Sequence, residues 1–264
     1  NMTTLFLCHS SGFGHIEGTA GLCRANAYGI EVSDFSEADV LGNADAVGTI
    51  AGSISGITGR ALHAPYLGLD PVSADRSVGK RTLEVYRLAC ETAVRLDMHH
   101  IIVHSIYDPS QHSLREWFRK SVAFWQAFLS EAPESVRVHI ENVMDSGPEI
   151  LLDMIRETGM PNCDVNLDIG HARVFSDTPL AVWIRVLGRH IGYVHLHDNH
   201  GQADEHIGLG QGSIPLGDVC RMLKDCAPES VWAVESGGIG MTQSLRWLKR
   251  HGFIDAVSGL ADNG

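Results

Sequence analysis

Residues 80–105 have the sequence KRTLEVYRLACETAVRLDMHHIIVHS, a helical pattern followed at once by an apolar run. Apolar residues recur at three- and four-residue steps through Leu83, Tyr86, Cys90 and Ala93, which predicts a helix over 80–96. The run HHIIVHS at 99–105 has the continuous apolar centre of a strand that is covered on both faces. A helix that leads into such a strand is typical of a parallel α/β sheet.

The same alternation extends over the rest of the chain. Eight β-rich runs are found, at 4–10, 28–34, 59–65, 99–105, 136–143, 164–172, 191–199 and 230–236. Helical segments lie between them, at about 80–96, 113–131, 148–158, 178–189, 214–226 and 240–250, with two glycine-punctuated helices expected within 11–27 and 42–58. Eight such units in 264 residues predict an α/β protein with a single (β/α)8 TIM barrel over 1–264 and a surface tail from about 253.

Composition excludes several classes of protein. The chain is 44% hydrophobic and 20% charged, as expected of an ordinary globular protein. Acidic residues outnumber basic ones 32 to 20, which disfavours binding to nucleic acid. The six cysteines form no Cys-x-x-Cys pair, and no apolar stretch is long enough to span a bilayer. We therefore expect a cytoplasmic protein with buried thiols.

Polar residues close the apolar runs at one end. In a barrel of this kind the carboxyl ends of the strands carry the chemistry, so these positions are candidates for a site. They are His63, His104, Glu141, Asp168 with His171 just beyond, His195 and Glu235, and the loop after the seventh strand adds Asp204 and His206. The last two form an Asp-x-His pair, whose side chains converge on one ion if the backbone is extended.

A metal site explains this set better than separate structural roles do. Any one of these residues alone is more often a hydrogen-bonded structural group. Several carboxylates buried at one mouth, however, repel one another unless cations neutralise them. Oxygen and imidazole donors without cysteine fit zinc, manganese, cobalt, iron or magnesium. Other histidines, among them His100 and His139, are expected to be structural or solvated, and His197 could support His195 from behind.

Five short strings carry a family resemblance. They are LHAP at 62–65, ENV at 141–143, LDIGHA at 167–172, VHLHDNHGQADEHIGLGQGSI at 194–214 and AVES at 233–236. Together they resemble the xylose isomerase-like TIM-barrel superfamily, which includes sugar phosphate isomerases and epimerases and the endonuclease IV type of apurinic-site nuclease. The resemblance covers nearly the whole chain and implies one of two kinds of metal enzyme.

In the isomerase and epimerase branch, the resemblance implies one divalent ion held by Glu141, Asp168, His195 and Glu235. In the endonuclease branch it implies three zinc ions. His63, His104 and Glu141 would hold the first, the four residues just named the second, and His171, Asp204 and His206 the third. The number of ions, from one to three, stays open at this point, as does a barrel that only binds a ligand.

The charge of the loops at the barrel mouth favours the isomerase and epimerase branch. The loops SIYDPSQHS at 105–113, DNHGQADEH at 198–206 and SSGFGHIEG at 10–18 hold no Lys or Arg to contact a phosphate backbone. We expect a carbohydrate substrate, free or phosphorylated, that reacts through an enediolate with Glu141 and Glu235 as acid and base. His171 is expected to polarise a substrate oxygen, and Glu31 and His197 to contact substrate. The oligomeric state, monomer or homo-oligomer, is left open, and a multinuclear zinc hydrolase is the alternative.

Overall fold

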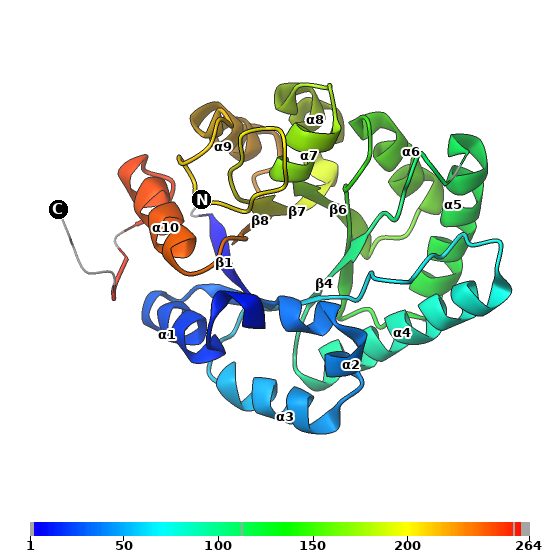
Figure 1. Ribbon diagram of the computed structural model, residues 1–264, viewed down its shortest axis with the longest axis horizontal. Coiled ribbons are helices and arrows are strands. Elements are labelled where there is room, and N and C mark those ends of the chain that lie inside the picture. The colour runs from blue at the N-terminus through cyan, green and yellow to red at the C-terminus, as the bar shows by residue number, and fades with distance from the viewer. Residues whose placement is uncertain (1–2, 112, 256, 260–264) are drawn as a thin grey trace.

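Eight parallel strands close into a barrel in chain order (Figure 1). The computed structural model describes residues 3–111, 113–255 and 257–259. The strands are β1 (Thr4–His9), β2 (Gly29–Val32), β3 (Arg60–His63), β4 (His100–His104), β5 (Arg137–Glu141), β6 (Cys163–Asp168), β7 (Ile191–Leu196) and β8 (Val231–Val234). The predicted (β/α)8 TIM barrel is confirmed.

Helices surround the barrel as an outer ring (Figure 1). They are α1 (Ile16–Asn26), α2 (Ala38–Leu41), α3 (Ala44–Ser53), α4 (Arg76–Arg95), α5 (Leu114–Glu131), α6 (Pro148–Thr158), α7 (Ile169–Phe175), α8 (Leu180–Leu187), α9 (Leu216–Cys226) and α10 (Ile239–Arg250). Short 3-10 turns lie at Ser11–Phe13, Ser33–Ser36 and Gly188–His190. Each strand is therefore followed by a covering helix, and all strands end at the same side of the barrel.

The sixth strand ends at Asp168, as predicted, and the rest of the β-rich run 164–172 is not extended. In that part of the run α7 begins directly at Ile169. The carboxylate of Asp168 accepts a hydrogen bond at 2.7 Å from the backbone N–H of His171, which caps the new helix. This early helix start turns His171 back toward the barrel mouth.

The two helices expected within the glycine-punctuated segments both form there. Segment 11–27 divides into a 3-10 turn and α1, and segment 42–58 contains only α3, which Asn43 caps through the backbone N–H groups of Asp45 and Ala46. The capping amide fixes where α3 starts.

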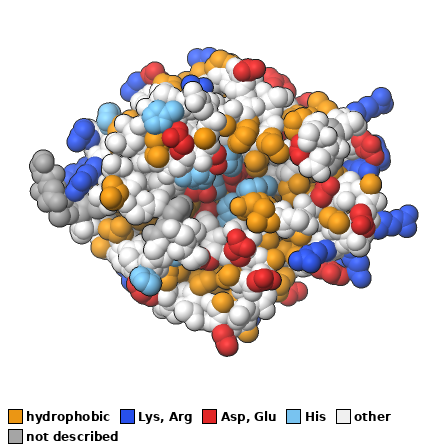
Figure 2. Space-filling model, viewed as in Figure 1, with side chains coloured by type: hydrophobic (Ala, Val, Ile, Leu, Met, Phe, Trp, Pro, Cys, Tyr) orange, Lys and Arg blue, Asp and Glu red, His pale blue; other side chains and the backbone are white. Residues whose placement is uncertain are grey.

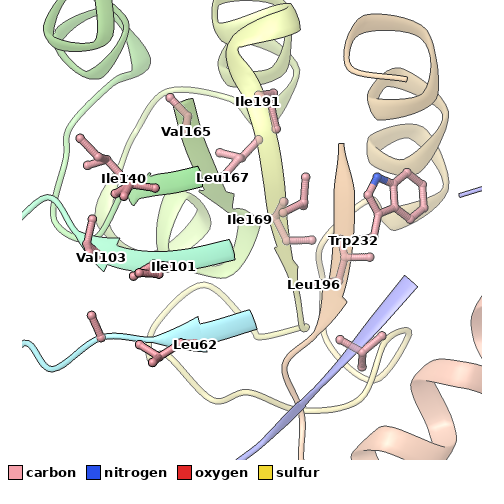
Figure 3. Close-up of a cluster of buried hydrophobic side chains, with 14 of the residues drawn as sticks. Leu62, Ile101, Val103, Ile140, Val165, Leu167, Ile169, Ile191, Leu196 and Trp232 are labelled. Carbon is pink, nitrogen blue, oxygen red and sulfur yellow. The ribbon is translucent and has the colours of Figure 1, made fainter. Parts of the chain in front are cut away.

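Two apolar cores hold the barrel. The larger lies between strands and helices, where side chains such as Leu62, Ile101, Ile140, Leu167 and Trp232 point outward from the strands (Figure 3). The smaller fills the inside of the barrel and consists of Phe6, Cys8, Ala61, Ile102, Tyr193, Val231 and Ala233. The barrel is thus a packed core rather than a pore, and polar side chains can converge only at its mouth.

Glycine is required where the Phe6 ring lies. A Cβ at Gly29 would come within 2.3 Å of this ring and one at Gly59 within 2.9 Å. The interior is therefore packed to contact just below the layer that carries the candidate site.

All six cysteines are free, and five of them are buried, as their apolar surroundings predicted. No helix in the described part of the chain is both long and apolar enough to cross a membrane. The single domain over 1–264 with a tail from about 253 stays a prediction, because 256 and 260–264 lie outside the described residues.

Candidate metal centre

Four side chains meet around one nitrogen at the mouth of the barrel. His195 Nδ1 lies 3.2 Å from Glu235 Oε2, 3.4 Å from Glu141 Oε2 and 3.6 Å from Asp168 Oδ2. Glu141, Asp168 and His195 stand at or near the ends of β5, β6 and β7, and Glu235 directly follows β8. The structure thus brings together the four residues predicted for a central ion, which we call the central cluster.

The spacing of the central cluster fits a divalent ion. Zinc binds nitrogen and carboxylate oxygen at about 2.0–2.2 Å, so tetrahedral donors lie about 3.3 Å apart. The three distances from His195 Nδ1 scatter around this value, and neither His195 Nδ1 nor Glu235 Oε2 has a hydrogen-bond partner although both atoms are buried. Buried polar atoms without partners are rare, and a shared cation would satisfy both. The residues therefore fit a metal.

Electrostatics support charged carboxylates at this position. Burial alone would raise the pKa of Asp168, but neighbouring His171 and His197 outweigh burial and hold this pKa well below its usual range. Burial is likewise outweighed at Glu141, where His195 and His104 keep the pKa well below its usual value. Both groups are fully or almost fully buried, so the site presents negative charge to whatever it binds.

A second group lies beside Glu141. His63 Nε2 is 3.6 Å from Glu141 Oε2, and His104 Nε2 is 3.9 Å from Glu141 Oε1. The other ring nitrogen of His63, Nδ1, faces the carbonyl oxygen of Ala64 at 3.0 Å, which leaves Nε2 toward the carboxylate. Burial lowers the pKa of His104 to about 3, so this ring is neutral, as a metal ligand must be. His63, His104 and Glu141 can share one ion.

A third group lies on the outer side of the central cluster. Asp204 Oδ2 is 2.8 Å from His206 Nε2 and 3.2 Å from His171 Nε2. The Asp-x-His pair does converge, although the backbone is not extended there, because His206 has φ 49° in the left-handed region. Buried Asp198 fixes the rest of this loop by accepting hydrogen bonds from the backbone N–H groups of Gly210, Gly212 and Ile214.

Two residues predicted to contact substrate are buried beside the central cluster. His197 is fully buried, and its Nε2 lies 3.1 Å from Asp168 Oδ1. Its ring needs the glycine of LDIGHA, since a Cβ at Gly170 would lie within 1.9 Å of His197 Cε1. Glu31 is also fully buried, with Oε2 at 3.1 Å from His195 Nε2. Neither residue is among those that line the cavity at the mouth, and contact of either one with a substrate stays a prediction.

Two asparagines that we did not predict form hydrogen bonds to Glu141 and Asp168. Asn166 Nδ2 donates to Glu141 Oε2 at 2.9 Å, and Asn142 pairs with the backbone of Asp168 through both of its amide atoms. Asn166 lies two residues before Asp168 and so on the same face of β6, a signal that strand periodicity contains. Asn142 directly follows Glu141.

A dyad near the first two strands was also missed. His9 Nε2 lies 3.4 Å from Asp34 Oδ2, and Asp34 also accepts from the backbone N–H of Ser11 at 2.5 Å. His9 ends β1, so the strand-end rule applied to the first strand would have found it.

The mouth encloses a cavity of about 440 Å³. Glu141, His171, Asp204 and Glu235 line its floor, and hydroxyls and carboxylates from the ends of β1 and β2 line its opposite side. None of the described residues that line it is Lys or Arg. Figure 2 shows this hollow at the centre of the face, with acidic and histidine side chains inside it. Its chemistry suits a polar ligand without a large negative charge.

Comparison with curated proteins finds two relatives in Methanocaldococcus jannaschii. One uncharacterized protein is 30% identical over 188 residues, which are 67% of this chain and 64% of that protein. A second uncharacterized protein is 24% identical over 166 residues, 62% of this chain and 65% of that protein. The chain therefore spans slightly less than two thirds of the length of these relatives.

Solved structures with the same fold cover almost the whole chain. A D-tagatose 3-epimerase-like protein has a TM-score of 0.77 and 21% identity, over 94% of this chain and 97% of that chain. D-Allulose 3-epimerase from Methylomonas sp., in complex with D-allulose, has a TM-score of 0.75 and 16% identity, over 95% of this chain and 97% of that chain. The IolI protein with a bound zinc atom has a TM-score of 0.78 and 16% identity, over 98% of this chain and 100% of that chain. At these identities the likeness establishes the fold.

A family model assigns the chain more directly. This model, described as xylose isomerase-like TIM barrel, matches residues 7–251, a span that contains all eight strand ends and the three candidate groups at the mouth. With the closed barrel and the polar mouth already described, this match shows that the chain belongs to the xylose isomerase-like TIM-barrel family.

Proposed function

We propose that the chain is a divalent-metal-dependent isomerase or epimerase of a small sugar. The observation that carries the proposal is the central cluster, in which three carboxylates surround the unpartnered Nδ1 of His195 at the floor of a polar cavity. The fold neighbours support it, because one is a sugar epimerase solved with its sugar and another holds zinc.

Glu141, Asp168, His195 and Glu235 would hold the ion, which we expect to be manganese, zinc, cobalt or magnesium. When bound there, a divalent ion supplies Lewis-acid polarisation of adjacent carbonyl and hydroxyl oxygens of the sugar. Glu141 and Glu235 belong to β5 and the end of β8, which are three strands apart in the closed sheet. They can therefore approach a sugar from different sides, one removing a proton from carbon and the other returning it.

His171 and the cavity wall would orient the substrate. His171 is almost completely buried, lines the cavity and lies in ion-pair contact with Asp168, Asp204 and Glu141. Burial alone would lower its pKa, but these carboxylates outweigh burial and hold the pKa of His171 well above its usual value. A protonated His171 can donate a hydrogen bond to a substrate oxygen as negative charge develops there.

A screen of ketoses, aldoses and their phosphates with the manganese and zinc forms tests this function. We expect conversion of at least one free sugar, and faster conversion of the free sugar than of its phosphate, because the described cavity residues include no cation to bind a phosphate. Cleavage of phosphodiesters or abasic DNA without conversion of any sugar would contradict the proposal.

The convergence of all nine predicted ligands favours a second candidate, a multinuclear zinc hydrolase that resembles endonuclease IV. The groups around Glu141 and around Asp204 are both preformed next to the central cluster. In this candidate the same residues would bind up to three ions and act on a phosphate. The cation-free cavity argues against a polyanionic substrate such as DNA.

The double variant Asp204→Ala with His206→Ala separates these two functions. For a single-ion isomerase, the central cluster should keep its metal and activity should fall without being lost, since only an outer group is removed. For a hydrolase with three cooperating ions, the rate should fall by over about a hundredfold, equivalent to about 3 kcal/mol. Metal content and turnover are measured together.

Glu205→Ala is the matched control for this double variant. Glu205 lies between the two altered residues, but its carboxylate contacts His200 rather than the ligand groups. Its loss should leave both metal content and activity unchanged.

A further inference from the structure

Glu31 is a buried carboxylate without an evident structural need for its charge. It lies in β2, on the opposite side of the barrel from the strand that carries Asp168, and its side chain is fully buried. Its one charged contact among the described ion pairs is His195, through Oε2 and Nε2 at 3.1 Å. Burying a carboxylate is costly unless a specific partner compensates, so the pairing with His195 requires an explanation.

The two nitrogens of His195 face different groups. Nε2 faces Glu31, whereas Nδ1 faces the three carboxylates of the central cluster and has no hydrogen bond. The ring is packed between Tyr193, with centroids 5.9 Å apart, and His63, with centroids 6.0 Å apart in a stacked arrangement. The imidazole is therefore fixed in a plane that directs one nitrogen to Glu31 and the other to the cluster.

We propose that Glu31 is a positioning residue that accepts the Nε2–H proton of His195 in a hydrogen bond and so presents the Nδ1 lone pair to the metal. Which ring nitrogen of a histidine binds a metal is set by the hydrogen bond of the other nitrogen, and a carboxylate acceptor also raises the basicity of the ligand. The role depends on the proposed function, because it supposes that the central cluster binds an ion.

Neighbouring residues support this role over contact with substrate. Ser33 Oγ donates to Glu31 Oε1 at 3.4 Å, and Cys8 pairs with Glu31 in the register of β1 and β2. These neighbours hold the carboxylate beside the central cluster. Ser33 lines the cavity, but Glu31 itself is not among the residues that line it. Glu31 thus acts through His195, not on the sugar.

Glu31→Gln is the isosteric test. Zinc affinity of the full chain is measured by competition with a chromophoric chelator, and the cobalt form is examined by its visible absorption spectrum. We expect zinc to bind about 10–100-fold more weakly and the cobalt spectrum to change, since the charged acceptor behind the ligand is lost. Affinity and spectrum equal to those of the wild type would overturn the proposal.

Asp164→Asn provides a matched control. Asp164 also contacts a buried histidine, His139, and in addition pairs with Arg137. It lies four residues before Asp168 in β6, and His139 lies two residues before Glu141 in β5, so neither belongs to the central cluster. Its removal should cost stability in a similar way and leave zinc affinity unchanged. An equal loss of affinity in both variants would show a general structural effect and overturn the specific role of Glu31.

A second measurement uses the wild-type protein, so its outcome does not depend on whether a variant folds. Nitrogen-15 NMR of histidine-labelled wild-type protein with zinc should show His195 coordinated through Nδ1 and protonated at Nε2. Coordination through Nε2 would overturn the role of Glu31 while leaving a metal enzyme intact. If the wild-type chain binds no divalent ion, the proposed function itself fails.

Discussion

Asp168→Asn is expected to weaken binding of zinc or manganese by about a hundredfold or more. Asp168 is fully buried, lies 3.6 Å from His195 Nδ1 and accepts hydrogen bonds from His197 and the backbone of His171. Loss of one partner from a buried charged group costs about 3–5 kcal/mol, which corresponds to at least two orders of magnitude in affinity. Glu141→Gln should behave in the same way.

Metal content after gel filtration and a competition titration measure this effect. Asp164→Asn again serves as the control, because it removes a partly buried carboxylate from a histidine outside the central cluster. If Asp168→Asn and Glu141→Gln both retain their full metal content, the assignment of the central cluster as the metal site is wrong.

Glu235→Gln is expected to slow exchange of a substrate C–H proton with solvent by about 10²–10⁴-fold, the usual contribution of a general acid or base. In deuterated water the wild-type enzyme should place deuterium on the carbon next to the carbonyl of a converted ketose. Glu235 is suited to this task because it lines the cavity and its Oε2 has no hydrogen bond. Mass spectrometry of the recovered sugar measures the exchange.

Metal content has to be determined on the same Glu235→Gln sample, since Glu235 belongs to the central cluster. Exchange that is lost with metal still bound identifies Glu235 as acid or base, whereas loss of both identifies it chiefly as a ligand. Isomerisation without any incorporation of deuterium by the wild type would contradict a proton-transfer mechanism and indicate direct transfer of hydride between carbons.

The local pattern of apolar and polar residues in the sequence determined the architecture of this protein. Alternation of strands and helices is encoded in short-range periodicity, and the carboxyl ends of parallel strands must share one side of a closed barrel. For this reason the sequence alone places Glu141, Asp168, His195 and Glu235 at a common mouth. The exact ends of elements were less predictable, because the start of α7 depends on a capping hydrogen bond between Asp168 and His171.

Tertiary structure decided how these side chains are oriented and what lies behind them. Glu31 and His195 are 164 positions apart in sequence, and only the closure of the sheet brings the carboxylate to the back of the imidazole. The left-handed backbone of His206 likewise follows from the loop that Asp198 fixes, not from any periodicity. Sequence therefore determined which residues reach the mouth, since strand direction is local. Packing across the barrel decided which nitrogen or oxygen atom each of these residues directs into the mouth and which hydrogen bonds it forms. These contacts join distant parts of the chain, so local sequence does not determine them.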